Sequence, residues 1–201
     1  MAKVALNKSS LKSQKDLRDT YEKFLPSLDL KKQQLLAEAA KARHRLQAQN
    51  KKLDAYKLST SEWVALLGSP TLSYALNGLV KLSGWETRQE NVAGVLLPVL
   101  GEIHFQVRPY TLLGAPVWFD ILVDALKSIA EMKLEVHILT ERVEKLNKAL
   151  KKVTQRINLF EQVLIPSCQK NIRSIKLFLE DNQRTAVCRS KLAKAKLTKS
   201  A

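Results

Sequence analysis

The sequence predicts a mainly α-helical protein, built as a long antiparallel two-helix coiled-coil hairpin with a small head, containing a β-hairpin, between the two arms. All six glycines of the 201 residues fall between Gly68 and Gly114, and because glycine and proline punctuate helices, the flanking arms can form unusually long ones. The C-terminal arm repeats apolar residues every seven positions, whereas the centre has a β-like pattern. The chain therefore divides into an N-terminal coiled-coil arm (1–67), a head (68–116) and a C-terminal coiled-coil arm with a basic tail (117–201).

The C-terminal arm carries two interleaved apolar series, each with a period of seven residues. All 13 positions are apolar, as expected for the seam of a coiled coil, and Glu, Lys and Arg are frequent between them. After Leu164 the spacing slips by four residues to Cys168, which predicts a local unwinding or kink of the helix at Pro166. The first series is Leu122, Ile129, Val136, Val143, Leu150, Ile157 and Leu164, and the second is Ala125, Met132, Leu139, Leu146, Val153 and Phe160.

The N-terminal arm has a weaker apolar stripe with the same alternation of three and four residues, which Lys32 and Gln49 interrupt. A C-terminal arm that paired with a copy of itself would leave this stripe without a partner, so we expect the two arms to pack on each other within one chain. Pro26 is expected to bend a helix or to start one. The stripe comprises Leu25, Leu28, Leu35, Ala39, Ala42, Leu46, Leu53 and Tyr56.

The head is expected to contain a β-hairpin. A segment of mixed polarity, Leu79–Glu90, is followed by a β-rich segment, Asn91–Leu100, with Gly94 and Gly101 as breaks. Pro98 places the second strand at the edge of a sheet, because proline cannot donate a hydrogen bond to a neighbouring strand.

The formal net charge of +15 is carried by the arms. Residues 68–116 hold 3 basic and 3 acidic residues, against 14 and 7 before them and 17 and 9 after them. Beyond Asp181 there are six basic residues and no acid, so this end either binds an acidic or polyanionic surface or stays solvated. The six are Arg184, Arg189, Lys191, Lys194, Lys196 and Lys199.

No arrangement of residues in the sequence indicates catalysis. No glycine is followed by lysine, so the phosphate-binding loop of nucleotide hydrolases is missing. His44, His104 and His137 are far apart in the sequence and have none of the spacings typical of zinc sites. We therefore expect no catalytic residue, no cofactor and no metal ligand.

The cysteines and the apolar segments indicate where the protein resides. Cys168 and Cys188 would lie roughly 30 Å apart on one helix, out of disulfide reach, which is typical of a reducing compartment. The N-terminus lacks the apolar core of a secretory leader. Trp63–Val80 has 18 uncharged residues, but it contains Gly68 and Pro70, so we expect it to pack within the protein rather than to cross a membrane.

Several segments of the sequence resemble the D subunit of the V-type and related A-type rotary ATPases. Ala5–Leu11 and Thr154–Pro166 resemble blocks of this family, the second being similar to its "RRVNALE … IP" signature. Glu90–Val95 resembles its central "ENVAG" segment, and Leu28–Leu36 is similar to its "LKLKRxxLL" segment. The matching segments occur in the order of the family and span both arms and the head.

The resemblance implies a non-catalytic rotor subunit of the central stalk, which couples ATP hydrolysis or synthesis to rotation and to transport of H⁺ or Na⁺ across a membrane. The implied partners are the catalytic and regulatory nucleotide-binding subunits (A and B) of the ring, the F subunit of the stalk, and the funnel-like adaptor of the membrane rotor. The implied location is cytoplasmic and peripheral to the membrane. On this resemblance the ends of the arms enter the ring, the hairpin Val80–Leu100 lies beside the F subunit, and the loop Pro109–Pro116 faces the membrane rotor.

The same resemblance gives candidate contact residues. The expected contacts with the ring are Asn7, Lys8, Ser9, Ser10, Leu11, Arg156, Asn158 and Glu161. The expected contacts with the stalk partner are Val80, Leu82, Trp85, Val92, Val95 and Leu97.

Two other classes of protein share part of this pattern. A basic helical hairpin that binds RNA would account for the charge of +15, but here the basic residues are spread among acids and are not interleaved with aromatic residues. A tethering coiled coil would associate with itself along the seam instead of requiring ring subunits. We expect no nucleic acid among the partners.

Overall fold

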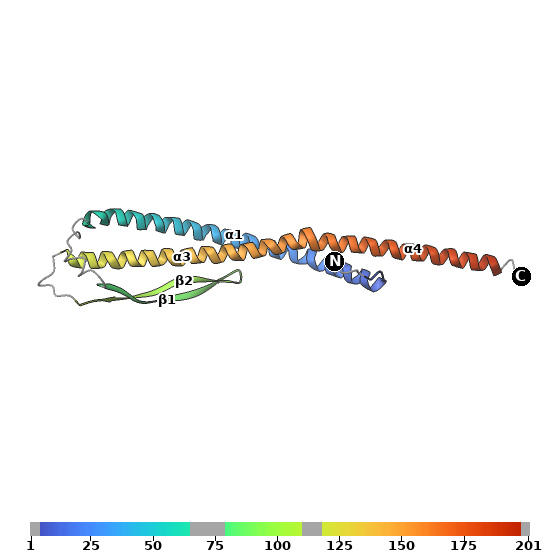
Figure 1. Ribbon diagram of the computed structural model, residues 1–201, viewed down its shortest axis with the longest axis horizontal. Helices are drawn as coiled ribbons and strands as arrows, with labels where there is room; N and C mark the ends of the chain where they lie inside the picture. Colours follow the sequence, from blue (N-terminus) through green and yellow to red (C-terminus); the bar gives the residue numbers. More distant parts are fainter. Residues whose placement is uncertain (1–4, 65–78, 110–117, 198–201) are drawn as a thin grey trace. The chain divides into compact units, whose positions relative to one another are not determined.

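The computed structural model describes residues 5–64, 79–109 and 118–197 (Figure 1). In chain order its elements are α1 (Lys8–Val64), β1 (Val80–Val92), β2 (Val95–Val107), α3 (Phe119–Leu159), a π-helical turn (Phe160–Leu164) and α4 (Ile165–Leu197). Two long helical arms with an antiparallel β-hairpin between them confirm the predicted fold class.

The chain divides into two compact units. The end unit comprises Met1–Lys32 and Lys152–Ala201, and the hairpin unit comprises Gln33–Lys151. Each unit therefore contains a section of both arms. These units group residues by contact, whereas the predicted arms and head are consecutive segments of the chain, so the predicted domain division stays a prediction.

The seam that the heptads predict is buried. All 13 heptad positions of the C-terminal arm are buried or half-buried, and so is every residue of the stripe in the N-terminal arm. In the hairpin unit Leu35 of α1 and Leu146 of α3 are fully buried. The Arg43 guanidinium of α1 donates a hydrogen bond to Asn147 Oδ1 of α3 at 2.7 Å. The two arms therefore pack on each other within one chain, as expected.

α1 begins at a side-chain cap and continues through a proline. Asn7 Oδ1 accepts a hydrogen bond from the Ser10 N–H at 2.7 Å, and the Asn7 carbonyl accepts one from the Leu11 N–H at 3.1 Å, which makes Asn7 the N-cap. Pro26 lies inside α1 and does not start a helix. The buried stripe on either side of Pro26 offsets the cost of an interior proline, about 3 kcal/mol.

β1 and β2 are joined by a two-residue turn. Ala93 and Gly94 have φ values of 51° and 77°, the left-handed conformation that type I′ turns require at both central positions. This turn lies in the segment Glu90–Val95 that resembles the family's central motif, and the positive φ of Gly94 explains why a glycine is needed there.

The strand break expected at Gly101 is wrong. β2 continues through Gly101 to Val107, and the pairing shifts register between Trp85 and Thr87 of β1. A Cβ at Gly101 would lie only 3.0 Å from the carbonyl oxygen of Glu86. Glycine therefore permits a close approach of the two strands at an irregularity instead of ending the strand.

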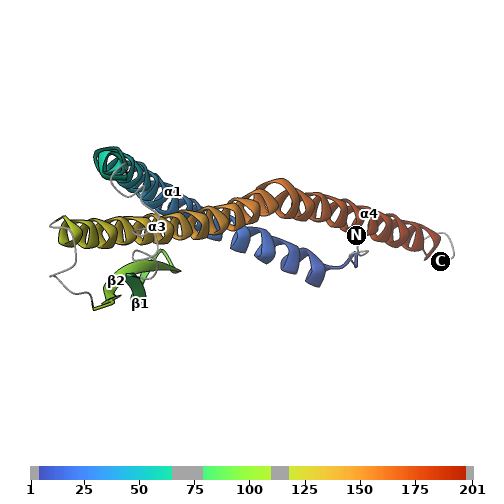
Figure 2. The ribbon, with the colours of Figure 1, turned by 60° about the vertical axis from the view of Figure 1, so that its left-hand side comes forward.

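The hairpin is folded back along α3 within the hairpin unit, and α3 lies between α1 and the hairpin in two views (Figures 1 and 2). Near the start of β1, Leu79 forms a buried cluster with Phe119 and Val123 of α3. Near the turn, the Arg142 guanidinium donates a hydrogen bond to Glu90 Oε2 at 2.8 Å. α3 thus has a second buried face in addition to the seam.

In the end unit α1 packs antiparallel to the C-terminal arm. The rings of Tyr21 and Phe160 have centroids 5.2 Å apart, and the Asn171 side chain donates a hydrogen bond to Gln14 Oε1 at 3.1 Å. The π-helical turn lies just before Pro166 and confirms the local unwinding that the slipped spacing predicts. Beyond it, the buried residues of α4 are Cys168, Ile172 and Ile175.

Candidate interaction surfaces

The predicted ring-contact block at the start of α1 is partly accessible. Asn7, Lys8 and Ser9 are exposed, whereas Ser10 and Leu11 are half-buried. Because Asn7 Oδ1 already caps α1, its side chain has a structural role. Lys8 and Ser9 therefore present the most accessible side chains of this block.

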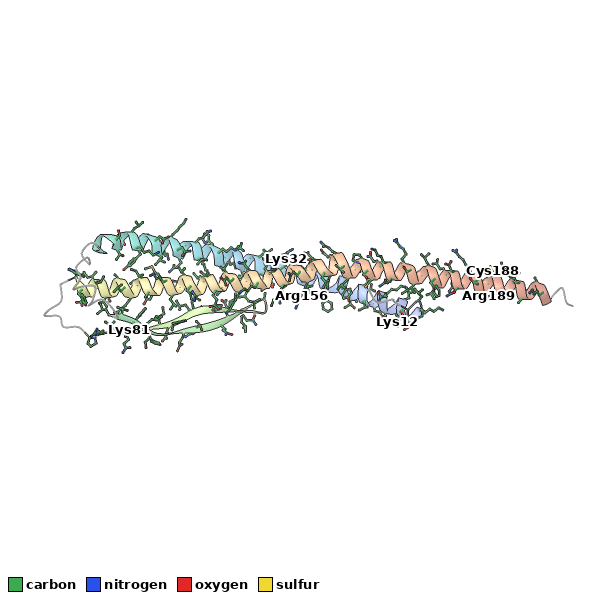
Figure 3. The ribbon with its side chains drawn as sticks, in the orientation of Figure 1. Lys12, Lys32, Lys81, Arg156, Cys188 and Arg189 are labelled. Atoms are coloured by element: carbon green, nitrogen blue, oxygen red, sulfur yellow. The ribbon has the colours of Figure 1, made fainter. Side chains whose placement is uncertain are left out.

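The second predicted ring-contact block lies at the end of α3 and in the π-helical turn. Arg156, Asn158 and Glu161 are all exposed, and the Arg156 side chain projects from the end of α3 (Figure 3). The Gln14–Asn171 hydrogen bond places the start of α1 about 16 residues, or about 24 Å, beyond Glu161 along the C-terminal arm. The structure thus does not bring the two predicted blocks together into one site.

The last part of α4, Glu180–Lys196 (here the α4 tip), differs from the rest of the helix because every one of its residues is exposed. α1 begins at Lys8, and the Gln14–Asn171 hydrogen bond places that first turn near Leu177, so α4 continues past the start of α1. The sequence reveals the charge of this segment but not that it is an uncovered helix. Its basic residues are Arg184, Arg189, Lys191, Lys194 and Lys196.

Apolar side chains accompany the charges of the α4 tip. Val187 is 53% exposed and Leu192 is 63% exposed. Cys188 is an exposed free thiol and projects from the tip beside Arg189 (Figure 3). An exposed helix that is both basic and apolar can contact a protein surface with acidic and apolar groups.

The predicted stalk-partner contacts on the hairpin fall into two groups. Leu82 and Trp85 of β1 are 42% and 47% exposed, which is high for large apolar side chains. Leu97 of β2 is fully buried and supports the hairpin from within. The remaining members, Val80, Val92 and Val95, are half-buried.

The pairing register joins the exposed residues of β1 to half-buried ones of β2. Leu82 pairs with Phe105, and Trp85 pairs with Ile103. Paired residues share a face of the sheet, so these four side chains form one apolar ledge on the hairpin. Phe105 and Ile103 of β2 are half-buried, whereas Leu82 and Trp85 of β1 are exposed, so the accessible part of the ledge lies on β1.

Most ion pairs of the arms join residues three or four positions apart on one helix. A hydrogen bond from Lys41 lowers the pKa of Glu38, and one from Lys145 lowers the pKa of Glu141. Burial raises the pKa of the Cys168 thiol. Short-range pairs of this kind support a helix surface but provide no proton donor or acceptor tuned for catalysis.

Residues 5–64, 79–109 and 118–197 contain no group of three or more His, Cys, Asp or Glu side chains placed to hold a metal ion. Within the same ranges, no helix combines the length and the apolar character needed to span a membrane. The loop expected to face the membrane rotor, Pro109–Pro116, lies outside the described residues except for Pro109.

Comparison with known proteins gives full-length similarity. Residues 10–195 match the family model described as the D subunit of ATP synthase. The chain is 33% identical over 199 residues to the V-type ATP synthase D subunit of Borreliella burgdorferi, covering 99% of this chain and 97% of that relative. It is 31% identical over 195 residues to the protein of the same name in Chlamydia pneumoniae, covering 96% and 93%, and 30% identical over 196 residues to that of Chlamydia muridarum, covering 98% and 97%.

Proposed function

The chain belongs to the D-subunit family of V-type ATP synthases, and from this premise we propose that the ends of its two arms lie within the nucleotide-binding ring of the complex. As a member of this family it is a central-stalk component of a rotary ATPase and is not catalytic by itself. The alternatives of an RNA-binding hairpin and of a tethering coiled coil are not supported by the comparisons.

The α4 tip is the observation that carries this proposal. An isolated helix of about 17 residues is marginal in water, so a segment with no buried residue gains order from a surrounding partner. The basic residues of the tip and its exposed Val187 and Leu192 suit a socket that offers both acidic and apolar groups. Lys8 and Ser9 at the start of α1 and Arg156, Asn158 and Glu161 further along the arm extend this contact with the A and B subunits.

The apolar ledge of the hairpin is proposed as the contact with the F subunit of the stalk. Leu82 and Trp85 are its accessible members, and a half-exposed tryptophan is a frequent anchor of protein interfaces. Leu97 is fully buried near the hairpin turn, where it pairs with Glu90, so it is not accessible as a contact residue. The loop Pro109–Pro116 is proposed to meet the funnel-like adaptor of the membrane rotor, which places the chain on the cytoplasmic side, peripheral to the membrane.

The mechanism is mechanical coupling between the ring and the membrane rotor. Sequential ATP hydrolysis in the ring turns the shaft, and ion flow through the membrane rotor turns it in reverse for synthesis. A shaft of this kind must resist twisting, and the packed seam of large apolar side chains in both arms provides that stiffness. The exposed Glu, Lys and Arg residues keep the outer surface solvated during rotation.

Crosslinking within the assembled complex tests the proposed polarity. The chain is isolated through an affinity tag at its native level, and photo-reactive groups are introduced at Ser9 and at Ala115 in separate variants. We expect the nucleotide-binding subunits to co-isolate, with Ser9 labelling them and Ala115 labelling the rotor adaptor. Labelling of the same partner from both positions would overturn the polarity, and a chain isolated without ring subunits would overturn the proposed assembly.

A further inference from the structure

A groove runs along the hairpin unit where α1, β2 and α3 meet. It has a volume of about 380 Å³ and is lined by Arg45 and Lys52 of α1, by Pro98 of β2, and by Ile138 and Arg142 of α3. None of these five residues belongs to the contacts that the sequence predicts.

The groove continues along α1. A second hollow of about 510 Å³ shares Gln49 and Lys52 with the first and extends to Ser59. From Arg45 to Ser59 the trough follows α1 for about 21 Å, or four helical turns. A trough of this length fits an extended or helical segment of a protein better than a compact small molecule.

The floor of the groove is apolar. Ile138 is 4% exposed, Leu139 and Leu100 are half-buried, and Pro98 is buried. A proline in a strand turns its nitrogen to the unpaired edge and has no N–H to donate, so a strand added to β2 at Pro98 would lack a hydrogen bond. The occupant is therefore held by side chains rather than by extension of the sheet.

Cations flank this floor. Among the described residues, Arg45 and Lys52 form no ion pair, although Arg45 is near enough to Glu38 to help lower its pKa. Arg142 is 8% exposed and one of its nitrogens donates to Glu90. The acid in the lining, Glu135, accepts a hydrogen bond from Gln49. The groove therefore presents net positive charge beside an apolar floor.

We propose that this groove binds an acidic amphipathic segment of a neighbouring protein in the complex, with apolar side chains on Ile138 and carboxylates beside Arg45, Lys52 and Arg142. The proposal rests on membership of the rotary complex, since it needs a resident partner. Of the described residues that line the two hollows only Tyr56 is aromatic, so there is no series of rings on which successive bases would stack, and a nucleic acid is disfavoured. A second copy of a chain with a net charge of +15 is disfavoured by repulsion.

Site-specific photo-crosslinking in the intact complex tests this proposal. One variant carries the reactive group at Ala48, an exposed residue of the groove lining, and the control carries it at the neighbouring Gln47, which is exposed but not in the lining. We expect Ala48 to label one partner protein, through a peptide rich in Asp and Glu, and Gln47 not to label that peptide. Labelling from Ala48 of nucleic acid, of a second copy of this chain or of no protein would each overturn the proposal.

Charge reversal then tests the role of the cations. Lys52→Glu is compared with Lys51→Glu, which makes the same change outside the groove lining. With the labelled partner and the full chain both purified, we expect Lys52→Glu to raise the Kd at least about tenfold and Lys51→Glu to change it less than about twofold. Equal effects of the two variants would overturn the proposal. Co-isolation of the ring subunits with the wild-type chain is measured in the same preparation. Absence of ring subunits would contradict the proposed assembly, whereas their presence without labelling from Ala48 would contradict only the proposed groove partner.

Discussion

The C-terminal arm passes through three environments that differ in how many of its faces are covered. In the hairpin unit α3 packs against α1 on one side and against the hairpin on another. In the end unit α4 is covered on one face as far as Ile175 and Leu179, and the α4 tip has no buried residue. Stability is therefore concentrated at one part of the arm, while the exposed, basic part is available for partners.

This comparison separates residues that hold the chain together from residues that serve the complex. A buried apolar side chain contributes to folding of the chain alone, whereas the exposed apolar side chains of the tip lose contact with water only when a partner is present. Four measurements test the distinction, and their expected effects decrease from the first to the last.

Substitution of matched apolar residues on α4 gives the largest difference. Ile175 is fully buried and Leu192 is 63% exposed, although both lie on the same helix. We expect Ile175→Ala to lower the free energy of unfolding by about 3 kcal/mol and Leu192→Ala to lower it by less than about 0.5 kcal/mol. Urea unfolding of the purified chain measures both values. Similar losses for the two variants would contradict the contrast between the covered and the uncovered parts of α4.

The two cysteines report the same contrast through their reactivity. Cys168 is 6% exposed and Cys188 is exposed. Because burial raises the pKa of the Cys168 thiol, less of it is thiolate at about pH 8, and its access to reagent is also restricted. In single-cysteine variants, Cys188 should react with a disulfide reagent about a hundredfold faster than Cys168. Urea should abolish the difference, and equal rates without urea would show that the covered part of α4 opens readily.

The packing of the hairpin on α3 depends in part on Arg142. Its side chain is 10% exposed in its ion pair with Glu90, whose side chain is 53% exposed. We expect Arg142→Gln to destabilise the hairpin by about 1 kcal/mol and Glu90→Gln to do so by less, because only the arginine is removed from solvent. Hydrogen exchange of β1 and β2 amides measures the effect. Arg156→Gln, at an exposed position, is the control and should leave exchange in the hairpin unchanged.

Removal of the tip should have the smallest effect on folding. A chain that ends at Asp181 loses no residue that the structure shows as buried between 182 and 196, so its melting temperature should change by less than about 2 °C. In the same variant, co-isolation of the ring subunits should fall, whereas a chain that ends at Leu197 should retain it. A large drop in melting temperature would mean that the tip stabilises the isolated chain.

The sequence predicts the seam well because its signal is repeated many times. The heptads of the C-terminal arm predict α3 and the covered part of α4. The weaker stripe of α1 is sufficient to predict which of its residues are buried once the two arms are considered together. The hairpin is also predicted, since its two segments and Gly94 carry the usual signals of strands and turns. Local patterns of this kind depend only on neighbours in the chain.

The packing of the hairpin on α3 is not predictable in the same way. Phe119, Val123 and Ile138 are buried although they lie outside the seam, and so is Arg142, a charged residue of a type that is usually exposed to solvent. Its burial depends on Glu90, which is 52 residues away in the chain. Gly101 is likewise misinterpreted as a strand end, because the close approach of Glu86 depends on the register of the partner strand. The groove and the separation of the two ring-contact blocks require the same long-range information.

The π-helical turn at Phe160–Leu164 has a consequence for insertions and deletions. If the heptads before it continued unchanged, Asn171 and Ser174 would occupy the central positions of the seam, whereas the structure buries Ile172 and Ile175 and leaves Asn171 half-buried and Ser174 exposed. The buried positions after the turn are therefore one residue later than the heptads predict, and the π-helical turn, which is wider than an α-helical turn, accommodates this additional residue. Loss of one codon within this turn would leave the buried face of α4 in phase with that of α3, whereas the same loss elsewhere in the arm would rotate everything beyond it by about 100°.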